Sequence, residues 1–271
     1  MAITGRIQKF DSMLDFTNQV KLYRVQDNPN ASSREGDKRW AGTDTFGEAV
    51  ELAENGWREG LKKIKKAIED LEALPAIEML PVFDVCGEAF NLDAVLQGQP
   101  ENMFYFMPQE SNKPRVISIS FAFNFRAKTK SSEIIKRGAA IASAVNDLEN
   151  QGLRVELYAH KLTVKQGNAM QDGLFTIIKV KDADQHLDLE RLVYIAAHPS
   201  MNRRLGFRLC EQYNKEEFRA RIGNLYGHAE QAEDHDFESA GIHKPCIIQQ
   251  DHVDPVQIKA LIQDHVNNIQ N

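Results

Sequence analysis

The sequence predicts an α/β protein with a wound, mostly parallel sheet flanked by helices and an amino-terminal helical arm. An alternating apolar segment, a long helical pattern and a second apolar segment follow one another, which is the order of a parallel crossover unit. Further strand and helix patterns continue to the carboxyl terminus. The 271 residues are 42% hydrophobic and 27% charged, the usual composition of a folded protein.

Charge and composition exclude several classes of protein. With 33 basic and 39 acidic residues the net charge is −6, so the chain is not a broadly basic nucleic-acid coat. No apolar run approaches the roughly 18 residues of a membrane span, and the first residues lack a secretory signal. Cys86, Cys210 and Cys246 are far apart, which predicts no disulfide framework. We therefore expect a cytoplasmic protein that does not bind membranes.

Residues 1–112 are predicted to form an arm, a long helix and short strands. The first ~40 residues are polar and rich in turn formers, so we expect them to be irregular. Thr45 and Glu48 have the spacing of a capping box, and apolar residues then recur at helical intervals to about Leu74, with a bend near Gly56. Short strands are predicted at 82–87 and 103–107, a helical turn at 92–96, and a domain boundary at 108–114.

Residues 113–271 are predicted to form the wound α/β domain. In residues 115–125, Ile117, Ile119, Phe121, Phe123 and Phe125 alternate with smaller or polar residues, which predicts a strand. A helix follows from Ser131 to Gly152. The remaining predicted elements are strands at 153–159, 174–180 and 245–248 and helices at 189–197, from 201 onward with Ser200 as its cap, and at 255–269.

Basic residues supply the candidate binding site. Arg126, Lys128 and Lys130 come just after a predicted strand, where wound sheets place their binding loops. The adjacent phenylalanines could stack on bases of a single strand, but their shared side with Ile117 favours burial in the core. The full candidate set for binding nucleic acid or a partner is Arg126, Lys128, Lys130, Arg137, Arg203, Arg204 and Arg208.

A metal site and a catalytic centre have weaker support. His228, His235, His243 and His252 lie among acidic residues, but their spacing does not place them on one helical face, and a mobile acidic loop explains the same composition. A G-x-S-x-G elbow, a P-loop and a dinucleotide-binding glycine motif are all absent from the sequence. We therefore predict no catalytic residues, no bound metal and no cofactor.

Three sequence blocks resemble a family of uncharacterised tailed-bacteriophage proteins. They are WAGTDTFGEA at 40–49 with GWREG at 56–60, RGAA at 137–140 with LENQGLRVEL at 148–157, and HPSMNRRLGF at 198–207. The resemblance implies a phage context and the cytoplasm of the host cell, without implying a reaction.

The second half also resembles a von Willebrand A-type domain in its order of strand, long helix and strand. In that fold a D-x-S-x-S motif at the end of the first strand holds a divalent ion. Residues 121–125 read FAFNF here, with no aspartate, and hard cations prefer several charged oxygen ligands. The resemblance therefore implies the fold without its metal site.

These observations predict a non-enzymatic phage adaptor, an accessory of a transcription or replication assembly that contacts single-stranded DNA. A protein partner is expected, because charge is locally segregated in an acidic chain. One alternative is a divalent-metal enzyme acting on nucleotides or phosphoesters through the carboxyl-terminal histidines. A second is a virion-associated or host-defence-inhibiting interaction protein.

Overall fold

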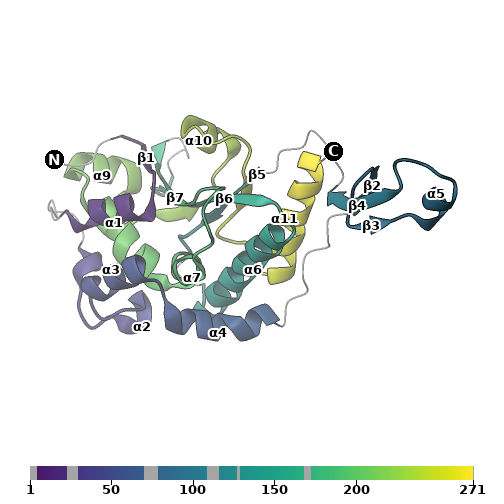
Figure 1. The fold of residues 1–271 in the computed structure, drawn as a ribbon. Coiled ribbons are helices and arrows are strands. Elements are labelled where there is room, and N and C mark those ends of the chain that lie inside the picture. The colour runs from purple at the N-terminus through teal and green to yellow at the C-terminus, as the bar shows by residue number, and fades with distance from the viewer. Residues whose placement is uncertain are drawn as a thin grey trace.

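A six-stranded sheet lies at the centre of the protein (Figure 1), and the computed structural model describes residues 5–22, 30–69, 79–108, 116–126, 129–167 and 172–270. The strand order is β1-β7-β6-β5-β9, with β8 added to β6. β5 is parallel to β6 and β9, and β1 is parallel to β7, whereas β6 is antiparallel to β7 and β8. The strands are β1 (Ile7–Phe10), β5 (Val116–Ala122), β6 (Arg154–Val164), β7 (Leu174–Lys181), β8 (His228–Glu230) and β9 (Cys246–Ile248). The predicted α/β class is confirmed.

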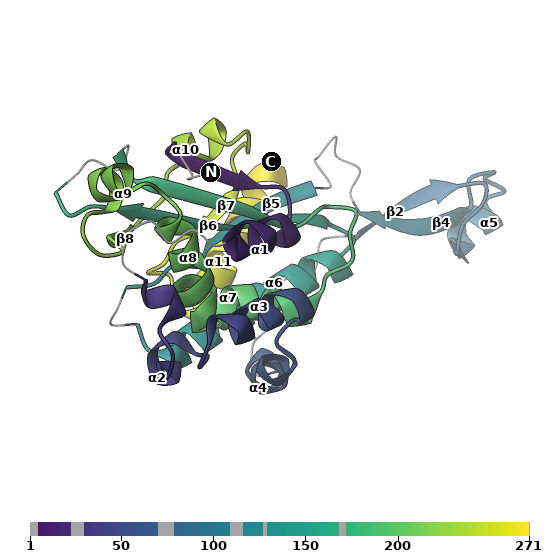
Figure 2. The same cartoon turned by 90° about the vertical axis from the view of Figure 1, so that its left-hand side faces the viewer.

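Helices cover the two faces of this sheet unequally (Figure 2). One face carries the main core, most of whose helical residues come from α1 (Met13–Lys21), α3 (Phe46–Asn55), α6 (Ser131–Asn150), α7 (Leu189–Ala197) and α11 (Pro255–Gln270), with a few from residues 201–209. The opposite face packs Tyr158, Leu162 and Phe175 against α10 (Asp234–Ser239) through Phe237. The other helices of the main body are α2 (Lys38–Ala41), α4 (Arg58–Glu69), α8 (Phe207–Glu211), α9 (Lys215–Ile222) and a π-helical turn at Met201–Gly206.

The alternating segment is the central strand, as predicted. Ile117, Ile119, Phe121 and Phe123 are at most 1% exposed and lie in the main core. Side chains alternate across a strand, so this row faces the helices and the serine row faces the other way. β5 then leads through α6 to the parallel strand β6, which confirms the predicted strand, helix and strand unit.

The helix predicted from Thr45 is broken into two. Thr45 accepts a hydrogen bond from the Glu48 amide at 3.1 Å and begins α3. α3 ends at Asn55 because Gly56 adopts a positive φ of 80°, a conformation that glycine adopts at little cost. A Cβ at Gly56 would lie 2.6 Å from the Cβ of Glu190. Close packing against α7 therefore requires glycine at the predicted bend.

The amino-terminal residues are not an irregular arm in the described part of the chain. Residues 7–10 form β1, an edge strand paired with β7, and Phe16 and Val20 of α1 are buried in the main core. The short apolar pieces that the sequence analysis assigned to an arm are therefore part of the sheet domain. The turn-forming residues that interrupt these apolar pieces led the sequence analysis to predict an irregular arm.

Two carboxyl-terminal predictions also need correction. The acidic stretch predicted as a mobile loop contains α10, whose Phe237 is fully buried. Ser200 does not cap the following helix, since its side chain makes no hydrogen bond to the helix amides. The predicted final strand and helix are confirmed as β9 and α11.

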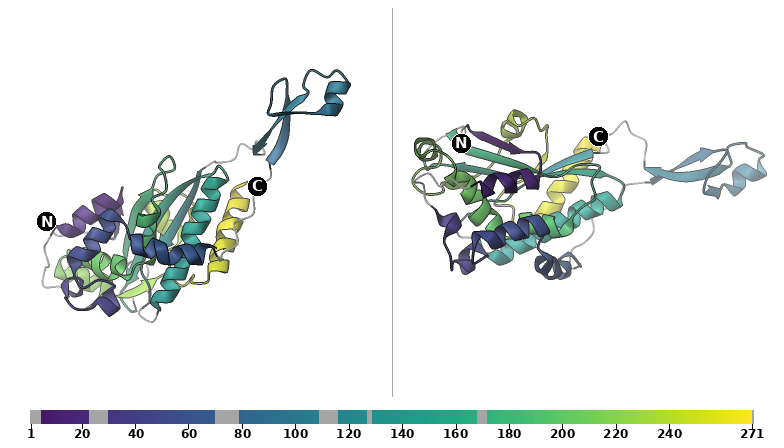
Figure 3. Two further views of the ribbon diagram at one scale, coloured as in Figure 1. Left: turned by 60° about the horizontal axis from the view of Figure 1, so that its bottom comes forward. Right: turned by 60° about the vertical axis from the view of Figure 1, so that its left-hand side comes forward.

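A small three-stranded unit extends away from the main body (Figure 3). It consists of β2 (Met79–Asp84), β3 (Ala89–Phe90), α5 (Leu92–Leu96) and β4 (Met103–Pro108), with sheet order β2-β4-β3. We call residues 79–108 the insert. Residues 5–69 share a core with residues 116–270, so the main body is discontinuous in sequence. The predicted boundary lies at the end of the insert, and residues 109–115 are outside the described part.

None of the described helices combines the length and the apolarity needed to cross a bilayer.

Candidate functional site

The carboxyl end of β5 carries two exposed cations, Arg126 and Lys130, on the connection to α6. Phe125 precedes them and is half-buried, in contrast to the fully buried Phe121 and Phe123. Neither cation forms an ion pair with another described residue. Lys128 lies outside the described residues. Phe125 therefore departs from the predicted burial of the whole phenylalanine row, and it lies close to the two exposed cations in sequence.

The amino end of α6 closes the same corner of the sheet. The Lys130 amide donates to the Glu133 carboxylate at 2.9 Å, which caps the first turn. The amino end of a helix attracts anions through its free backbone amides. The Glu133 carboxylate offsets part of that attraction in α6. An anionic ligand at this corner would meet Arg126, Lys130 and the helix end together.

Arg137 lies beneath this corner and is fully buried. Its Nε donates to the His252 carbonyl at 3.0 Å, and its Nη2 donates to the carbonyls of Ile248 and Gln249 at 3.1 and 3.2 Å. The guanidinium also lies 5.2 Å from the ring centre of Phe125. Burial lowers the pKa of Arg137 to about 9. The side chain thus joins α6 to the segment after β9, and it is not available as a surface contact.

A buried serine and histidine pair lies on the opposite face of β5 and β6. Ser120 Oγ and His160 Nδ1 are 2.8 Å apart, and both residues are at most 1% exposed. Nearby, the Asn124 amide donates to the Leu162 carbonyl at 2.8 Å. Sequence analysis missed this pair, because residues 40 positions apart give no local pattern. Its depth makes it a structural contact between two strands.

Lowering the pH is expected to destabilise the protein through His160. Burial, and then the charge of Arg137, lowers the pKa of His160 to about 3 from 6.5. The unfolded chain therefore binds a proton that the folded chain excludes, and stability falls as pH drops below 6.5. At pH 5 the loss is about 2 kcal/mol from this group. Urea unfolding at pH 7 and pH 5 measures it.

The matched variants for this pH test are His160→Gln and the exposed His243→Gln. The first removes the titrating ring and should flatten the pH dependence relative to the native chain, whereas the second should leave the slope unchanged. Identical slopes for the native chain and His160→Gln would contradict the assignment.

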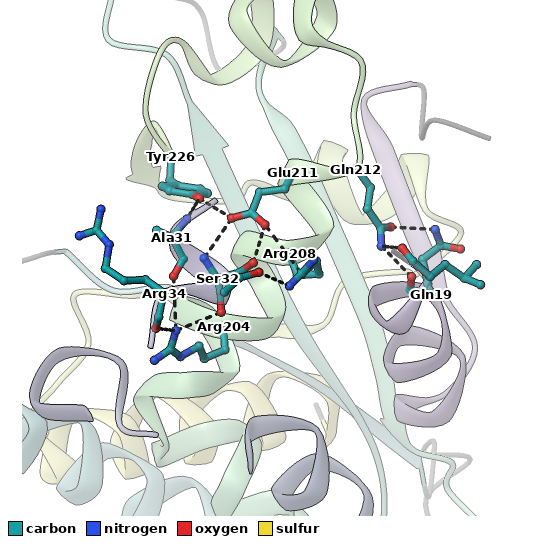
Figure 4. Close-up of polar contacts among 11 residues, drawn as sticks. Gln19, Ala31, Ser32, Arg34, Arg204, Arg208, Glu211, Gln212 and Tyr226 are labelled. Carbon is teal, nitrogen blue, oxygen red and sulfur yellow. Dashed lines mark hydrogen bonds and ion pairs between the residues drawn. The ribbon is translucent and has the colours of Figure 1, made fainter. Parts of the chain in front are cut away.

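The second basic cluster faces inward (Figure 4). Arg204 is fully buried. Its guanidinium donates to five backbone carbonyls, those of Ala31, Ser32, Arg34, Thr43 and Asp44. Arg203 donates to the Trp40 carbonyl at 2.5 Å, and its guanidinium lies 4.9 Å from the Trp40 ring centre. These side chains hold residues 31–44 against the π-helical turn.

Glu211 completes the same network from α8. Its buried carboxylate accepts hydrogen bonds from the amide and hydroxyl of Ser32 and from the Tyr226 hydroxyl. Burial raises the pKa of Glu211, an effect that these hydrogen bonds and the Arg208 charge oppose. Arg208 is 4% exposed and donates to Ser33 Oγ. Arg137, Arg204 and Arg208 are therefore structural, and the accessible part of the predicted set is Arg126, Lys130 and the half-buried Arg203.

His198 belongs to a buried cluster of rings. Its Nδ1 lies 2.8 Å from Ser200 Oγ, and the Tyr194 hydroxyl lies 3.2 Å from the same oxygen. The Trp57 ring meets His198 edge-on at 4.5 Å. Burial lowers the pKa of His198 to about 4. The cluster anchors the end of α7 to α4.

The carboxyl-terminal histidines do not assemble into a metal centre. His235 contacts Glu233 and Asp236 at 3.3 and 3.4 Å, and His252 accepts from the Gln249 amide. Within the described ranges, no group of three or more histidine, cysteine or carboxylate side chains is placed to hold one ion.

Comparisons with known proteins define the family and leave its function open. Neither the curated proteins nor the solved structures contain a match to this chain. One family model, described as a domain of unknown function (DUF7192), matches residues 4–266. That match covers the main body and the insert, so the chain belongs to the DUF7192 family.

Proposed function

We propose that this protein is a phage-encoded, non-enzymatic adaptor that contacts single-stranded DNA within a transcription or replication assembly. The observation that carries the proposal is the corner at the carboxyl end of β5, where Arg126 and Lys130 are exposed beside the half-buried ring of Phe125. Cations that follow phosphates and a ring that stacks on a base are the elements of single-strand binding.

The position of the corner gives further support. In open α/β sheets, ligands bind outside the carboxyl ends of the strands, at the point where the chain leaves to opposite sides. β5 is such a point, because its parallel neighbours β6 and β9 lie on either side of it. The proposed relationship to von Willebrand A-type domains rests on the same β5, α6 and β6 unit. Asn124 stands near the end of that strand and aspartate does not, so we assign no metal to the corner.

Binding of oligothymidylate at low and physiological salt tests the proposal. Each lost phosphate contact reduces the slope of log affinity against log salt by ~0.7 for single strands. The double variant Arg126→Gln, Lys130→Gln should therefore reduce the slope by ~1.4 and weaken binding at low salt. Phe125→Leu should weaken binding to the single strand and leave duplex binding unchanged.

The matched control is Lys62→Gln, Lys65→Gln, which removes the same charge from the exposed face of α4. This variant should bind as the native chain does. Salt-independent binding, or equal losses in the two double variants, would refute a nucleic-acid contact at the corner.

A further inference from the structure

Every charged residue of the insert is acidic. Residues 79–108 include Asp84, Glu88, Asp93 and Glu101 and contain no lysine, arginine or histidine. Its net charge is therefore −4, compared with −6 for the whole chain. A segment of this charge attracts a basic surface and repels anionic ones such as nucleic acid or acidic lipid.

The insert also exposes most of the large apolar side chains that face solvent in the described residues. Six of the eleven such side chains are in it, namely Phe83, Val85, Phe90, Leu92, Val95 and Leu96, with exposures from 43% to 76%. Ala94 is its one buried hydrophobic among the side chains described. Exposed apolar patches mark interaction sites in folded proteins, and six such side chains on one 30-residue unit indicate one here.

The local sequence builds this surface in a defined shape. β2 and β4 pair antiparallel in register, so Phe83 lies opposite Phe104 with ring centres 5.9 Å apart. The Asn91 side chain accepts from the Asp93 and Ala94 amides and begins α5. A unit of 30 residues is below the size at which a chain usually buries a core of its own, and an isolated three-stranded sheet needs packing on one face. The insert therefore presents apolar side chains without covering them.

We propose that the insert is a docking surface for a partner protein segment whose apolar side chains are flanked by lysine or arginine, such as a basic amphipathic helix. Charge complementarity is the reason for this choice of partner, because the insert has four carboxylates and no basic residue of its own to pair with them. The apolar side chains would supply the buried contact and the carboxylates its selectivity.

Within the part of the chain that the structure describes, a second copy of this protein does not offer the required surface. Its most basic helix, α4, exposes Lys62, Lys63 and Lys65, but the apolar Ile64 on that helix is fully buried against α6 and α7. Of the remaining exposed apolar side chains, Leu14 and Leu22 lie two turns apart on and just after α1, and the others are on separate elements. The occupant we assign is therefore a different protein.

This surface is separate from the proposed DNA corner. The insert precedes the amino end of β5, whereas Arg126 and Lys130 follow its carboxyl end. The two surfaces share no residue, so the side chains of one can be replaced without changing those of the other.

Two synthetic amphipathic peptides with the same leucine face, one with lysine and one with glutamate at the polar positions, test the docking surface on the full-length protein. Fluorescence anisotropy should show binding of the lysine peptide alone. Two double variants should each weaken that binding at least about tenfold. One is Phe83→Ser with Phe90→Ser, and the other is Asp84→Asn with Asp93→Asn. The control double variant Leu225→Ser, Val256→Ser should bind the lysine peptide as the native chain does. Because all the altered side chains are solvent-accessible, the unfolding temperature of all three double variants should stay close to that of the native chain.

Three results would overturn the inference. One is equal binding of both peptides, or of neither, by the native chain. Another is binding of the lysine peptide by the insert variants with undiminished affinity, which would attribute the binding to the net negative charge of the whole chain. The third is self-association of the native chain that Phe83→Ser, Phe90→Ser abolishes, since a second copy would then be the occupant.

Discussion

Replacement of Arg204 by alanine is expected to lower the free energy of unfolding by about 4 kcal/mol. The guanidinium is fully buried and satisfies five carbonyls, including that of Ser32 at 3.0 Å and that of Thr43 at 2.9 Å. Its removal leaves acceptors in the interior without donors, and each such group costs about 1–3 kcal/mol. Residues 31–44 should detach from the π-helical turn first.

Urea unfolding followed by circular dichroism measures this loss, with Arg34→Ala as the control. The Arg34 side chain is exposed and belongs to the same segment, so its loss should change stability by less than about 0.5 kcal/mol. A loss below about 1 kcal/mol for Arg204→Ala would instead place that guanidinium in solvent, where the sequence analysis had assigned it to partner binding.

Replacement of Phe121 by alanine is expected to cost about 4 kcal/mol. Phe121 is 0% exposed in the centre of β5, and its strand is paired on both sides, with β6 and β9. Loss of the ring reduces the apolar surface that folding buries and leaves a cavity. Because β5 is held between two paired strands, the backbone cannot move in to fill that cavity.

Val116→Ala is the control for Phe121→Ala, because Val116 begins the same strand and is 41% exposed. It should cost well under 1 kcal/mol. Comparable losses in the two variants, measured by thermal unfolding, would contradict an interior position for the phenylalanine row and would favour rings that are open to a ligand.

The centre of the fold was predictable because its residues follow strict periodicities. The alternation from Ile117 to Phe123 fits only a strand with one buried face, and the pattern from Ser131 to Gly152 fits only a helix. Both are local properties of the chain. The break at Gly56 was predictable for the same reason, since glycine at a helix bend has a local conformational cause.

The remainder depends on contacts between distant residues. Nothing near residues 7–10 indicates that they pair with β7, because an edge strand needs only a few residues of modest polarity. Arg137, Arg204 and Arg208 look like surface cations in sequence, whereas each is buried by carbonyl or hydroxyl acceptors on other segments. The sequence shows that these residues are charged, but only their tertiary contacts show whether the charge is exposed for binding or buried and hydrogen-bonded inside the protein.

The two proposed surfaces suit an adaptor. We propose that the cationic corner after β5 engages a nucleic acid while the acidic, apolar insert before it engages a basic protein, since the two surfaces share no residue. Their separation also allows each contact to be tested by variants that leave the main core intact.

Hydrogen–deuterium exchange of the full-length protein, with and without oligothymidylate, tests the central claim most directly. The account predicts protection of residues 123–126 and 129–136 around the corner, with no change in residues 201–211, where Arg204 and Arg208 are already buried. Protection confined to residues 201–211, or to the insert, would contradict it.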